Sequence, residues 1–218
     1  MTSLYKCFVE IFYSMVNISL LKQEYLNKIK KDLKKFKSGS KTYSIGLIGL
    51  PGSGKTYFAR LLSKKLSLYI ANADEVRLFL TKKEIKDPLQ QRIAEIICEA
   101  RTVFLYKNKI NFILDTDLIN FYEKAKKYAK ENNAEIFIIK LKCSEKLIFE
   151  RIKLRDKGID PTNPSPASFD KYFERKEQHY KKQKIDVFYE IDTSKKLELQ
   201  IKKLIKKIRK QINLNSSI

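Results

Sequence analysis

One segment of the sequence has the residue types and spacing of a phosphate-binding loop. Residues 49–56 read Gly-Leu-Pro-Gly-Ser-Gly-Lys-Thr and fit the pattern G-x-x-x-x-G-K-[ST]. Glycines allow successive backbone N–H groups to curl around phosphate oxygens, and the positive end of the following helix adds to the attraction. In this pattern Lys55 reaches the β- and γ-phosphates, and the Thr56 hydroxyl is placed to hold Mg²⁺. The predicted nucleotide-binding residues are Gly49, Pro51, Gly52, Ser53, Gly54, Lys55 and Thr56.

Two acidic residues each follow a short apolar run, where the carboxyl end of a buried strand is expected. Asp74 comes after residues 68–71, and Asp115 ends the run 111–115 in the manner of a Walker B strand. Because strand ends converge on the ligand at one edge of a parallel sheet, we expect both carboxylates at the site. Asp115 is predicted to hold Mg²⁺, directly or through its water ligands. The alternative is a turn or helix-start residue.

Asp74 and Arg77 form a candidate acceptor site. A carboxylate at this place can orient an acceptor hydroxyl and take its proton. Arg77 lies one helical turn further on and can bind anionic or polar groups of the acceptor. The spacing fits a second interpretation equally well, in which Asp74 caps the helix that begins at Glu75 and Arg77 is a surface ion-pair partner. Asp117 is a further candidate, either near the metal or on the substrate side.

Two of the eight arginines, Arg151 and Arg155, stand four residues apart in a segment with a helical pattern. They therefore share one helix face and can approach a single anionic target together. A guanidinium can brace transferring phosphoryl oxygens in a bidentate manner, and the alternative is ordinary surface charge. Three prolines in residues 158–167 break this helix. We predict a lid over the site at about residues 151–180, in which residues 172–180 contact either the acceptor or solvent.

The segments that position these residues alternate between short apolar runs and amphipathic helices. Strands are predicted at residues 44–50, 68–71, 110–114, 135–141 and 187–191. Strands rich in Ile and Val that alternate with helices imply right-handed crossovers and a parallel sheet covered on both faces. We therefore predict an α/β fold in three layers with a five-stranded parallel sheet. A lysine-rich amphipathic helix at about residues 195–212 is expected to pack back on the sheet.

The chain is predicted to contain one domain preceded by a helical extension. Its 218 residues, 43% of them hydrophobic, are enough for one core of ordinary size. Residues 18–37 have apolar side chains at helical spacing, and a Ser-Gly-Ser linker follows. We place a helical N-terminal extension at residues 1–42 and the main domain at residues 43–218. Either Met1 or Met15 is the start of the protein.

The formal net charge of the chain is +21, and most of the excess lies near its ends. Residues 1–43 hold nine Lys and three acidic residues (+6), and residues 195–218 hold eight Lys and Arg and one acidic residue (+7). A basic protein attracts nucleic acid and anionic surfaces, but lysine greatly outnumbers arginine, as in proteins of AT-rich genomes. A nucleic-acid partner is therefore the less favoured interpretation. No apolar run reaches the length of a membrane span.

The few cysteines and the single histidine exclude several kinds of site. Cys7, Cys98 and Cys143 lie far apart without a C-x-x-C pair, and His179 stands alone. A disulfide framework or a Cys/His zinc site needs clusters of these residues. The single histidine also argues against catalysis by a Ser/His/Asp arrangement. The cysteines are typical of small buried side chains in a reducing cytosol, so we expect a cytoplasmic protein.

With these motifs, residues 43–194 resemble the small P-loop kinases, in particular the polynucleotide-kinase-like and zeta-toxin-like branch. Members of this branch are often described only as AAA-type ATP-binding proteins. The resemblance rests on the phosphate loop after the first strand, on Asp74 and Arg77 after the second, and on the acidic end of the third. It implies the strand order 2-3-1-4-5, ATP and Mg²⁺ as ligands, and lid arginines at Arg151 and Arg155. The branch commonly has Asp-x-Thr where this chain has Asp-Thr-Asp at residues 115–117.

The function that these features predict together is transfer of the γ-phosphoryl group of ATP to a hydroxyl. The predicted catalytic residues are Lys55, Asp74, Arg151 and Arg155, the acceptor ligands are Asp74 and Arg77, and the Mg²⁺ ligands are Thr56 and Asp115. The Asp-Gly-Phe-Pro-Arg run of adenylate kinases and the glycine run of shikimate kinases are absent. The alternatives are an NTP-hydrolysing switch or nucleic-acid-handling module with basic terminal helices, and a membrane-surface protein attached by its N-terminal helix. The sequence does not identify the acceptor or the oligomeric state.

Overall fold

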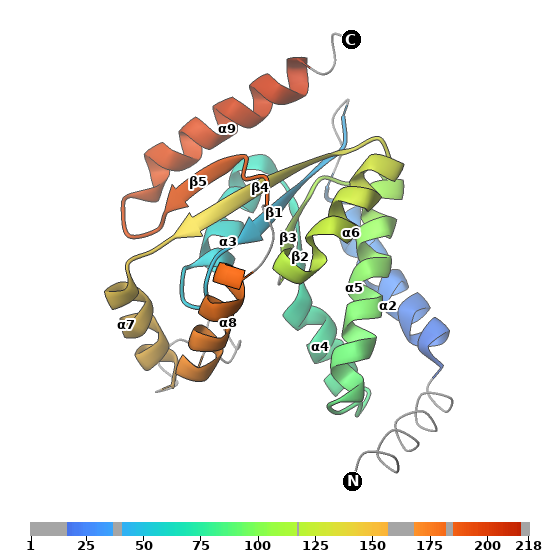
Figure 1. The fold of residues 1–218 in the computed structure, drawn as a ribbon. Helices are drawn as coiled ribbons and strands as arrows, with labels where there is room; N and C mark the ends of the chain where they lie inside the picture. The colour runs from blue at the N-terminus through green and yellow to red at the C-terminus, as the bar shows by residue number, and fades with distance from the viewer. Residues whose placement is uncertain (1–16, 37–40, 117, 157–167, 182–184, 215–218) are drawn as a thin grey trace.

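The computed structural model describes residues 17–36, 41–116, 118–156, 168–181 and 185–214. Five parallel strands form one sheet in the order β2-β3-β1-β4-β5 (Figure 1). Their bounds are β1 Tyr43–Ile48, β2 Tyr69–Asn72, β3 Phe112–Asp115, β4 Glu135–Lys142 and β5 Tyr189–Asp192. The predicted fold class and strand order are therefore confirmed.

Eight helices connect and flank these strands in the described part of the chain. They are α2 (Ile18–Leu33), α3 (Lys55–Leu66), α4 (Ala73–Thr81), α5 (Leu89–Lys107), α6 (Leu118–Glu131), α7 (Glu145–Asp156), α8 (Phe169–Lys181) and α9 (Leu197–Leu214). The bounds differ from the predicted ones by a few residues, because a helix end depends on local capping more than on periodicity. None of these helices is long and apolar enough to cross a bilayer.

Helices cover the sheet on both faces and divide the interior into two apolar cores (Figure 1). The core on one face contains residues of α3 and α9, and the core on the other face contains residues of α2, α4, α5 and α6. Strand β3 shows the alternation that this requires, since Ile113 belongs to the first core and Phe112 and Leu114 belong to the second. Both faces are buried, which explains the continuous apolar runs in the sequence.

Helix α9 packs on the sheet with the apolar stripe that its spacing predicts. Ile201, Leu204 and Ile208 are each at most 1% exposed and contact the strand residues of their core. The lysines of this helix lie between the apolar positions, and Lys202, Lys203, Lys206 and Lys210 are exposed. A stripe at three- and four-residue intervals is enough to hold a lysine-rich helix against the sheet.

Helix α2 also contributes to the interior, on the face of α5. Tyr25, Ile29 and Leu33 are buried in the same apolar core as Ile97 of α5. The predicted boundary at residue 42 separates α2 from the main domain. In the structure, however, the apolar side of α2 is part of the core of that domain. The boundary itself stays a prediction.

Candidate active site

The phosphate loop joins β1 to α3 at the carboxyl edge of the sheet. Gly52 and Gly54 have φ angles of 79° and 88°, in the left-handed region that glycine enters without steric cost. These angles fold the loop back on itself, and the Ser53 N–H donates to the Leu50 carbonyl at 3.1 Å. Gly54 is also the N-cap of α3, so the positive end of this helix adjoins the loop.

Two further observations show that the loop fits the phosphates of a nucleotide. A Cβ atom at Gly49 would lie 2.7 Å from the Ser53 hydroxyl oxygen and 3.0 Å from the Leu141 carbonyl, so a larger residue has no room there. The buried Ser53 hydroxyl has no hydrogen-bond partner among the described residues. Buried polar atoms are nearly always paired in folded proteins. The loop therefore combines a tight backbone curve with a buried polar group that has no partner in the described residues.

Lys55 begins α3, and its side chain turns back over the loop. Its ammonium group donates to the Gly49 carbonyl at 2.7 Å and to the Leu50 carbonyl at 3.1 Å. These bonds hold a positive charge beside the loop backbone. This is the place from which a lysine reaches the outer phosphates of a nucleotide.

Asp115 ends β3 as a buried carboxylate with 7% of its surface exposed. The Thr56 hydroxyl donates to it, and the Asn72 amide donates to its Oδ2 atom at 2.9 Å. Burial raises the pKa of Asp115 above its ordinary value, while the Lys55 ammonium and these two hydrogen bonds act in the opposite direction. The two predicted Mg²⁺ ligands thus lie in contact and present the hard oxygen atoms that Mg²⁺ prefers.

Asp74 lies in the first turn of α4 and forms an ion pair with Arg77. The Arg77 Nη1 atom donates to the Asp74 Oδ1 atom at 2.6 Å, and the two side chains are 50% and 37% exposed. The cap of α4 is Asn72, whose side-chain oxygen accepts from the Asp74 N–H at 2.6 Å. The structure therefore gives the capping role to another residue, but it contains the exposed ion pair with Arg77 that belongs to the same interpretation. The Asp74 carboxylate stays accessible, so its role as a base remains a prediction.

One cavity of about 640 Å³ brings most of the predicted site residues together. Its phosphate end is lined by Gly49, Pro51, Gly52, Gly54, Lys55 and Thr56. Asp74, Arg77 and Asp115 line the same cavity, and Ser53 lies buried within the loop. Residues that are up to 66 positions apart in the sequence meet here, because three strands end at the same edge.

Further lining of the cavity comes from α8 and from residues at or just before the start of α5. The residues are Asp87, Gln90, Gln91, Lys171, Glu174 and Arg175. Of these, Glu174 and Arg175 belong to the stretch 172–180 in which the sequence predicts contact with either the acceptor or solvent. The sequence does not predict Asp87, Gln90, Gln91 or Lys171 as site residues. The sequence pattern around them is weak evidence for a site, since polar residues before an apolar helical stripe are typical of any exposed helix start.

Arg151 lies beside the phosphate loop and does not line the cavity. Its Nη1 atom donates to the Gly52 carbonyl at 3.1 Å and lies 3.4 Å from the Thr193 hydroxyl. A Cβ atom at Gly54 would be 3.3 Å from the same nitrogen. The guanidinium therefore braces the outside of the loop in this structure. Arg155 belongs to α7, but its side chain lies outside the described residues.

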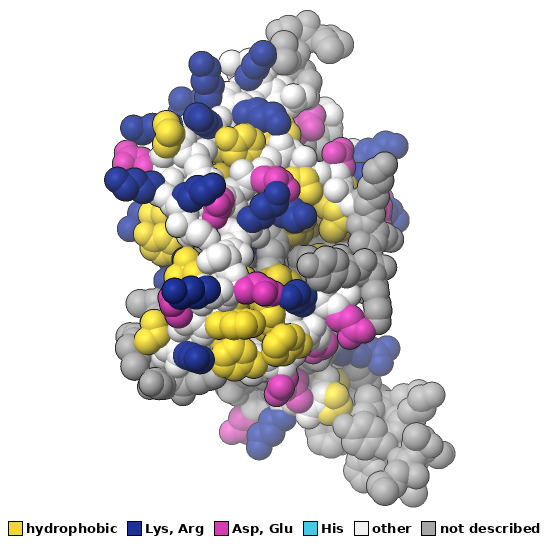
Figure 2. Space-filling model, turned by 60° about the vertical axis from the view of Figure 1, so that its left-hand side comes forward, with side chains coloured by type: hydrophobic (Ala, Val, Ile, Leu, Met, Phe, Trp, Pro, Cys, Tyr) yellow, Lys and Arg dark blue, Asp and Glu magenta, His cyan; other side chains and the backbone are white. Residues whose placement is uncertain are grey.

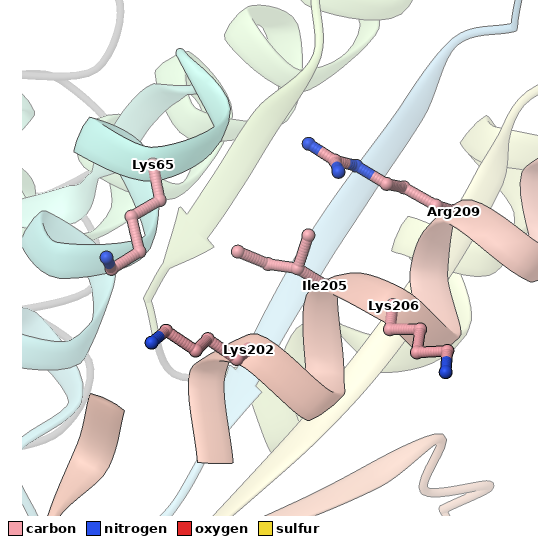
Figure 3. Close-up of a pocket in the computed structure, with 5 residues that line it drawn as sticks. All are labelled: Lys65, Lys202, Ile205, Lys206 and Arg209. Carbon is pink, nitrogen blue, oxygen red and sulfur yellow. The ribbon is translucent and has the colours of Figure 1, made fainter. Parts of the chain in front are cut away.

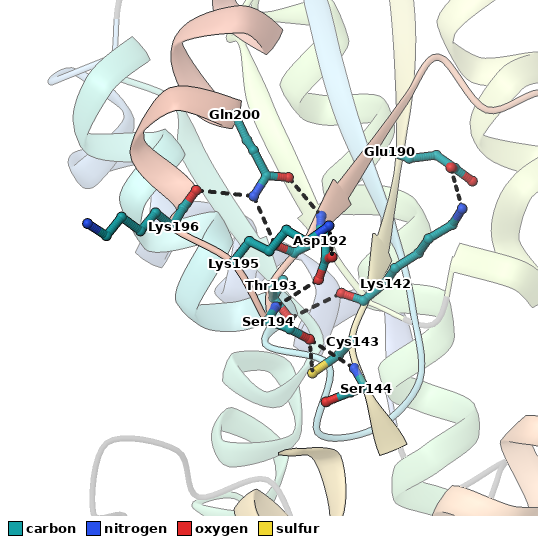
Figure 4. Close-up of polar contacts among 10 residues, drawn as sticks. All are labelled: Lys142, Cys143, Ser144, Glu190, Asp192, Thr193, Ser194, Lys195, Lys196 and Gln200. Carbon is teal, nitrogen blue, oxygen red and sulfur yellow. Dashed lines mark hydrogen bonds and ion pairs between the residues drawn. The ribbon is translucent and has the colours of Figure 1, made fainter. Parts of the chain in front are cut away.

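Thr193 follows β5 and holds the loop from the same side. Its hydroxyl donates to the Ser53 carbonyl at 2.7 Å, and its N–H donates to the Lys142 carbonyl at the end of β4 at 2.8 Å. Figure 4 shows how the segments after β4 and β5 are joined here, with the Ser144 N–H donating to the Ser194 hydroxyl at 2.9 Å. Apart from its place after an apolar run at the carboxyl edge of the sheet, nothing in the sequence indicates a role for Thr193.

The predicted lid is only partly described. Tyr172 is buried against Ile148 and Ile152 and donates to the Glu145 carboxylate at 2.7 Å, so it packs α8 on α7 and does not reach the cavity. Asp117, residues 157–167 and the side chains of residues 178–181 lie outside the described residues.

A second cavity of about 420 Å³ lies between α3 and α9 and contains none of the predicted site residues. Figure 3 shows Lys65 of α3 facing α9 across this gap. Its lining consists of Lys65, Lys202, Ile205, Lys206 and Arg209. Three basic residues of this groove belong to α9, one of the basic terminal helices that the less favoured nucleic-acid interpretation invokes.

Comparison with known proteins identifies the family of the chain. Residues 45–179 match the family described as AAA domain. The chain belongs to this family. It is 25% identical over 180 residues to a shikimate kinase of Bacillus cereus (strain G9842), a match that covers 78% of this chain and 99% of the relative. The protein is thus a small P-loop kinase, as its sequence predicts.

Solved structures share the fold at low sequence identity. A candidate kinase from Chloroflexus aurantiacus j-10-fl has a TM-score of 0.60 at 15% identity, over 80% of this chain and 98% of that chain. A gluconokinase from Sinorhizobium meliloti 1021 has a TM-score of 0.53 at 13% identity, over 81% of this chain and 97% of that chain. The arrangement of sheet and helices is therefore that of small kinases.

Proposed function

We propose that this kinase transfers the γ-phosphoryl group of ATP to a hydroxyl group of a small polar acceptor. The observation that carries the proposal is the single cavity in which the phosphate loop, Asp115 and the exposed carboxylate of Asp74 meet. The relative described as a shikimate kinase supports a hydroxyl acceptor. Shikimate itself is not proposed, because this chain lacks the glycine run of those enzymes after β3.

The phosphate end of the cavity binds and neutralises the nucleotide. The loop amides and the positive end of α3 attract the phosphates, and Lys55 adds a charge that can follow the outer phosphoryl group. Thr56 and Asp115 would hold Mg²⁺, which neutralises charge that develops between the β- and γ-phosphates. Asn72 keeps the Asp115 carboxylate oriented through its hydrogen bond at 2.9 Å.

The acceptor end of the cavity positions the hydroxyl and removes its proton. Asp74 is the one carboxylate of the predicted set that is both in the cavity and accessible, so it is our candidate for the general base. Arg77 holds this carboxylate in place and can donate to the acceptor with its other nitrogen atoms. Asp87, Gln90 and Gln91 supply further hydrogen-bonding groups, which suit an acceptor with several polar substituents.

Arg151 and Arg155 remain candidates for stabilising the transferring phosphoryl group. In this structure Arg151 bonds the Gly52 carbonyl, so this role requires α7 to move and release that bond. Closure of a helical segment over bound nucleotide is a common step in small kinases. A location in the cytoplasm is part of the proposal, and it agrees with Cys98 and Cys143, which are not in disulfides.

A phosphoryl-transfer screen tests the proposal. The purified protein is incubated with Mg²⁺, ATP labelled at the γ-phosphate and a panel of sugars, polyols, nucleosides, nucleotide sugars and oligonucleotides. We expect acceptor-dependent transfer that is lost in Lys55→Ala, because the lysine is part of the phosphate site. Lys64→Ala is the matched control, since Lys64 is an exposed lysine of the same helix.

Three results would contradict the proposal. Full turnover in Lys55→Ala would remove Lys55 from the site. ATP hydrolysis that no acceptor stimulates would favour the NTP-hydrolysing switch. Transfer that occurs only to oligonucleotides would favour the nucleic-acid-handling alternative.

A further inference from the structure

A charged side chain lies inside the apolar core behind the site. Arg101 is 1% exposed and is the largest fully buried side chain in the described part of the chain. It occupies a position at which α5 otherwise carries apolar residues, since Ile97 and Leu105, four residues on either side, are both 0% exposed. Burying a guanidinium is unfavourable unless its donors are well used. The position therefore needs an explanation other than core packing.

Arg101 donates hydrogen bonds to α2, to Cys98 of its own helix and, at the shortest distance, to the point where β2 becomes α4. Its Nη1 atom donates to the Asn72 carbonyl at 2.8 Å and to the Tyr25 hydroxyl of α2 at 3.0 Å. The nearest carboxylate is that of Glu75, at 3.9 Å, and the Glu75 side chain is 55% exposed. The Nε atom has no partner among the described residues. The charge is thus only partly compensated, and its shortest bond is to the backbone of Asn72.

Asn72 connects this buried arginine to both sides of the site. Its side-chain amide donates to the Asp115 carboxylate at 2.9 Å, and its side-chain oxygen accepts from the Asp74 N–H at 2.6 Å. In the sheet, Asn72 and Asp115 are paired across neighbouring strands. One residue therefore sets the orientation of the proposed Mg²⁺ ligand and the start of the helix that carries the proposed base.

We propose that Arg101 is a positioning residue that fixes Asn72, and through it Asp115 and Asp74, and that the Tyr25 hydroxyl of α2 completes this arrangement. The inference rests on the proposed function of the two carboxylates. It assigns α2 a part in the site, because α2 supplies a partner of the arginine. An apolar residue would fill the same space and continue the stripe of α5, so the charge serves the site and not the stability of the core.

The decisive variant is Arg101→Met, which keeps a long flexible side chain and removes the charge and its hydrogen bonds. We expect kcat to fall by about 10- to 100-fold, the usual effect of removing a group that orients a metal ligand. The KM for ATP should change little, because the phosphate loop is untouched. The melting temperature should stay near that of the wild type. Arg92→Met, an exposed position on the same helix, is the control and should leave all these quantities unchanged.

A binding measurement separates positioning from a general loss of activity. Calorimetry with ATP, with and without Mg²⁺, gives the increase in affinity that the metal produces. This increase should be smaller in Arg101→Met than in the wild type, since the Asp115 carboxylate is less well oriented, whereas ATP alone should bind equally. The measurement needs no acceptor, so it remains informative if the screen for phosphoryl transfer fails.

Two milder variants cover the case in which Arg101→Met does not fold. Asn72→Ala lies at the cavity and removes both side-chain hydrogen bonds, and it should reproduce the loss of kcat and of the Mg²⁺ effect. Tyr25→Phe removes one hydrogen bond and should lower kcat by about fivefold or less. Wild-type kcat and a wild-type Mg²⁺ effect in Arg101→Met would overturn the proposal. If Arg101→Met does not fold, the same result in Asn72→Ala would overturn it. A fall in melting temperature with unchanged kcat would overturn it as well.

Discussion

The two ends of the active-site cavity are built in different ways. The phosphate end consists of main chain and buried groups, with Ser53 at 1% and Asp115 at 7% exposure. The acceptor end consists of exposed side chains, among them Asp74 and Arg77, whose side chains are 37% and 50% exposed. Backbone held by glycines has little freedom to change, whereas exposed side chains on helices tolerate substitution. The comparison explains why the sequence indicates the nucleotide but does not identify the acceptor.

The largest expected effect comes from the acceptor end. Asp74→Asn keeps the shape of the side chain and removes the base, so we expect phosphoryl transfer to fall by roughly 10²–10⁴-fold, the usual range for general acid–base catalysis. ATP affinity should stay nearly unchanged, because the phosphate end is intact. The melting temperature should also change little, since Asn72 and not Asp74 caps α4.

Single-turnover assays and thermal melts on one preparation test this prediction. If Asp74→Asn lowers ATP affinity as strongly as it lowers transfer, the two ends of the cavity are not independent. If it lowers only the melting temperature, Asp74 is a structural residue.

A second expected effect concerns the stability of the phosphate end. Because burial raises the pKa of Asp115, its ionisation opposes folding as the pH rises through that pKa. Without nucleotide and Mg²⁺, Asp115→Asn should therefore melt at a higher temperature than the wild type at neutral pH. The difference should shrink in acid, where the wild-type carboxyl is protonated and uncharged. Turnover should be lost at all pH values.

Asp192 provides a control of opposite sign for the melting experiment. The hydrogen bond from the Ser194 N–H, together with the Lys195 side chain, holds the pKa of Asp192 below its ordinary value. Its ionised form therefore supports folding, and this support is lost as the pH falls through the lowered pKa. Asp192→Asn should thus melt at a lower temperature than the wild type at neutral pH. A lower melting temperature for Asp115→Asn would contradict the assignment of Asp115 as a buried carboxylate with a raised pKa.

The smallest expected effect concerns the lysines outside the cavity. Figure 2 shows Lys and Arg side chains spread over one face of the molecule, with acidic and apolar side chains between them. We expect that reversing the exposed lysines Lys203, Lys206 and Lys210 to Glu leaves turnover with a small acceptor unchanged. Any binding of oligonucleotides should be weak and should fall steeply with salt, as for phosphate contacts without base readout.

A salt titration of oligonucleotide binding with the intact and the reversed proteins measures this. Tight binding of the intact protein at physiological salt that the reversals abolish would make the groove between α3 and α9 a functional nucleic-acid site. It would also show that the basic charge is more than a feature of composition.

Much of the fold and about half of the site could be predicted from local patterns. The phosphate loop, the acidic end of β3 and the stripe of α9 are each defined by residues close together in the chain. Arg101 is visible in the sequence as one of only eight arginines and as an interruption of an apolar helical stripe, but its partners are not. For Arg151, in contrast, the sequence pattern was recognised but the contact could not be predicted. The spacing from Arg155 predicts a shared anionic target, whereas Arg151 donates to the Gly52 carbonyl.

The sequence by itself determined the nucleotide end, because a glycine loop between a strand and a helix can take few shapes. It also determined the parallel sheet, since strand and helix periodicities are local properties of the chain. Only the tertiary structure decided the rest. The contacts of Arg101 with Tyr25 and of Asn72 with Asp115 join residues 76 and 43 positions apart. Such pairs depend on how whole helices and strands pack, and no periodicity within a single segment contains that information.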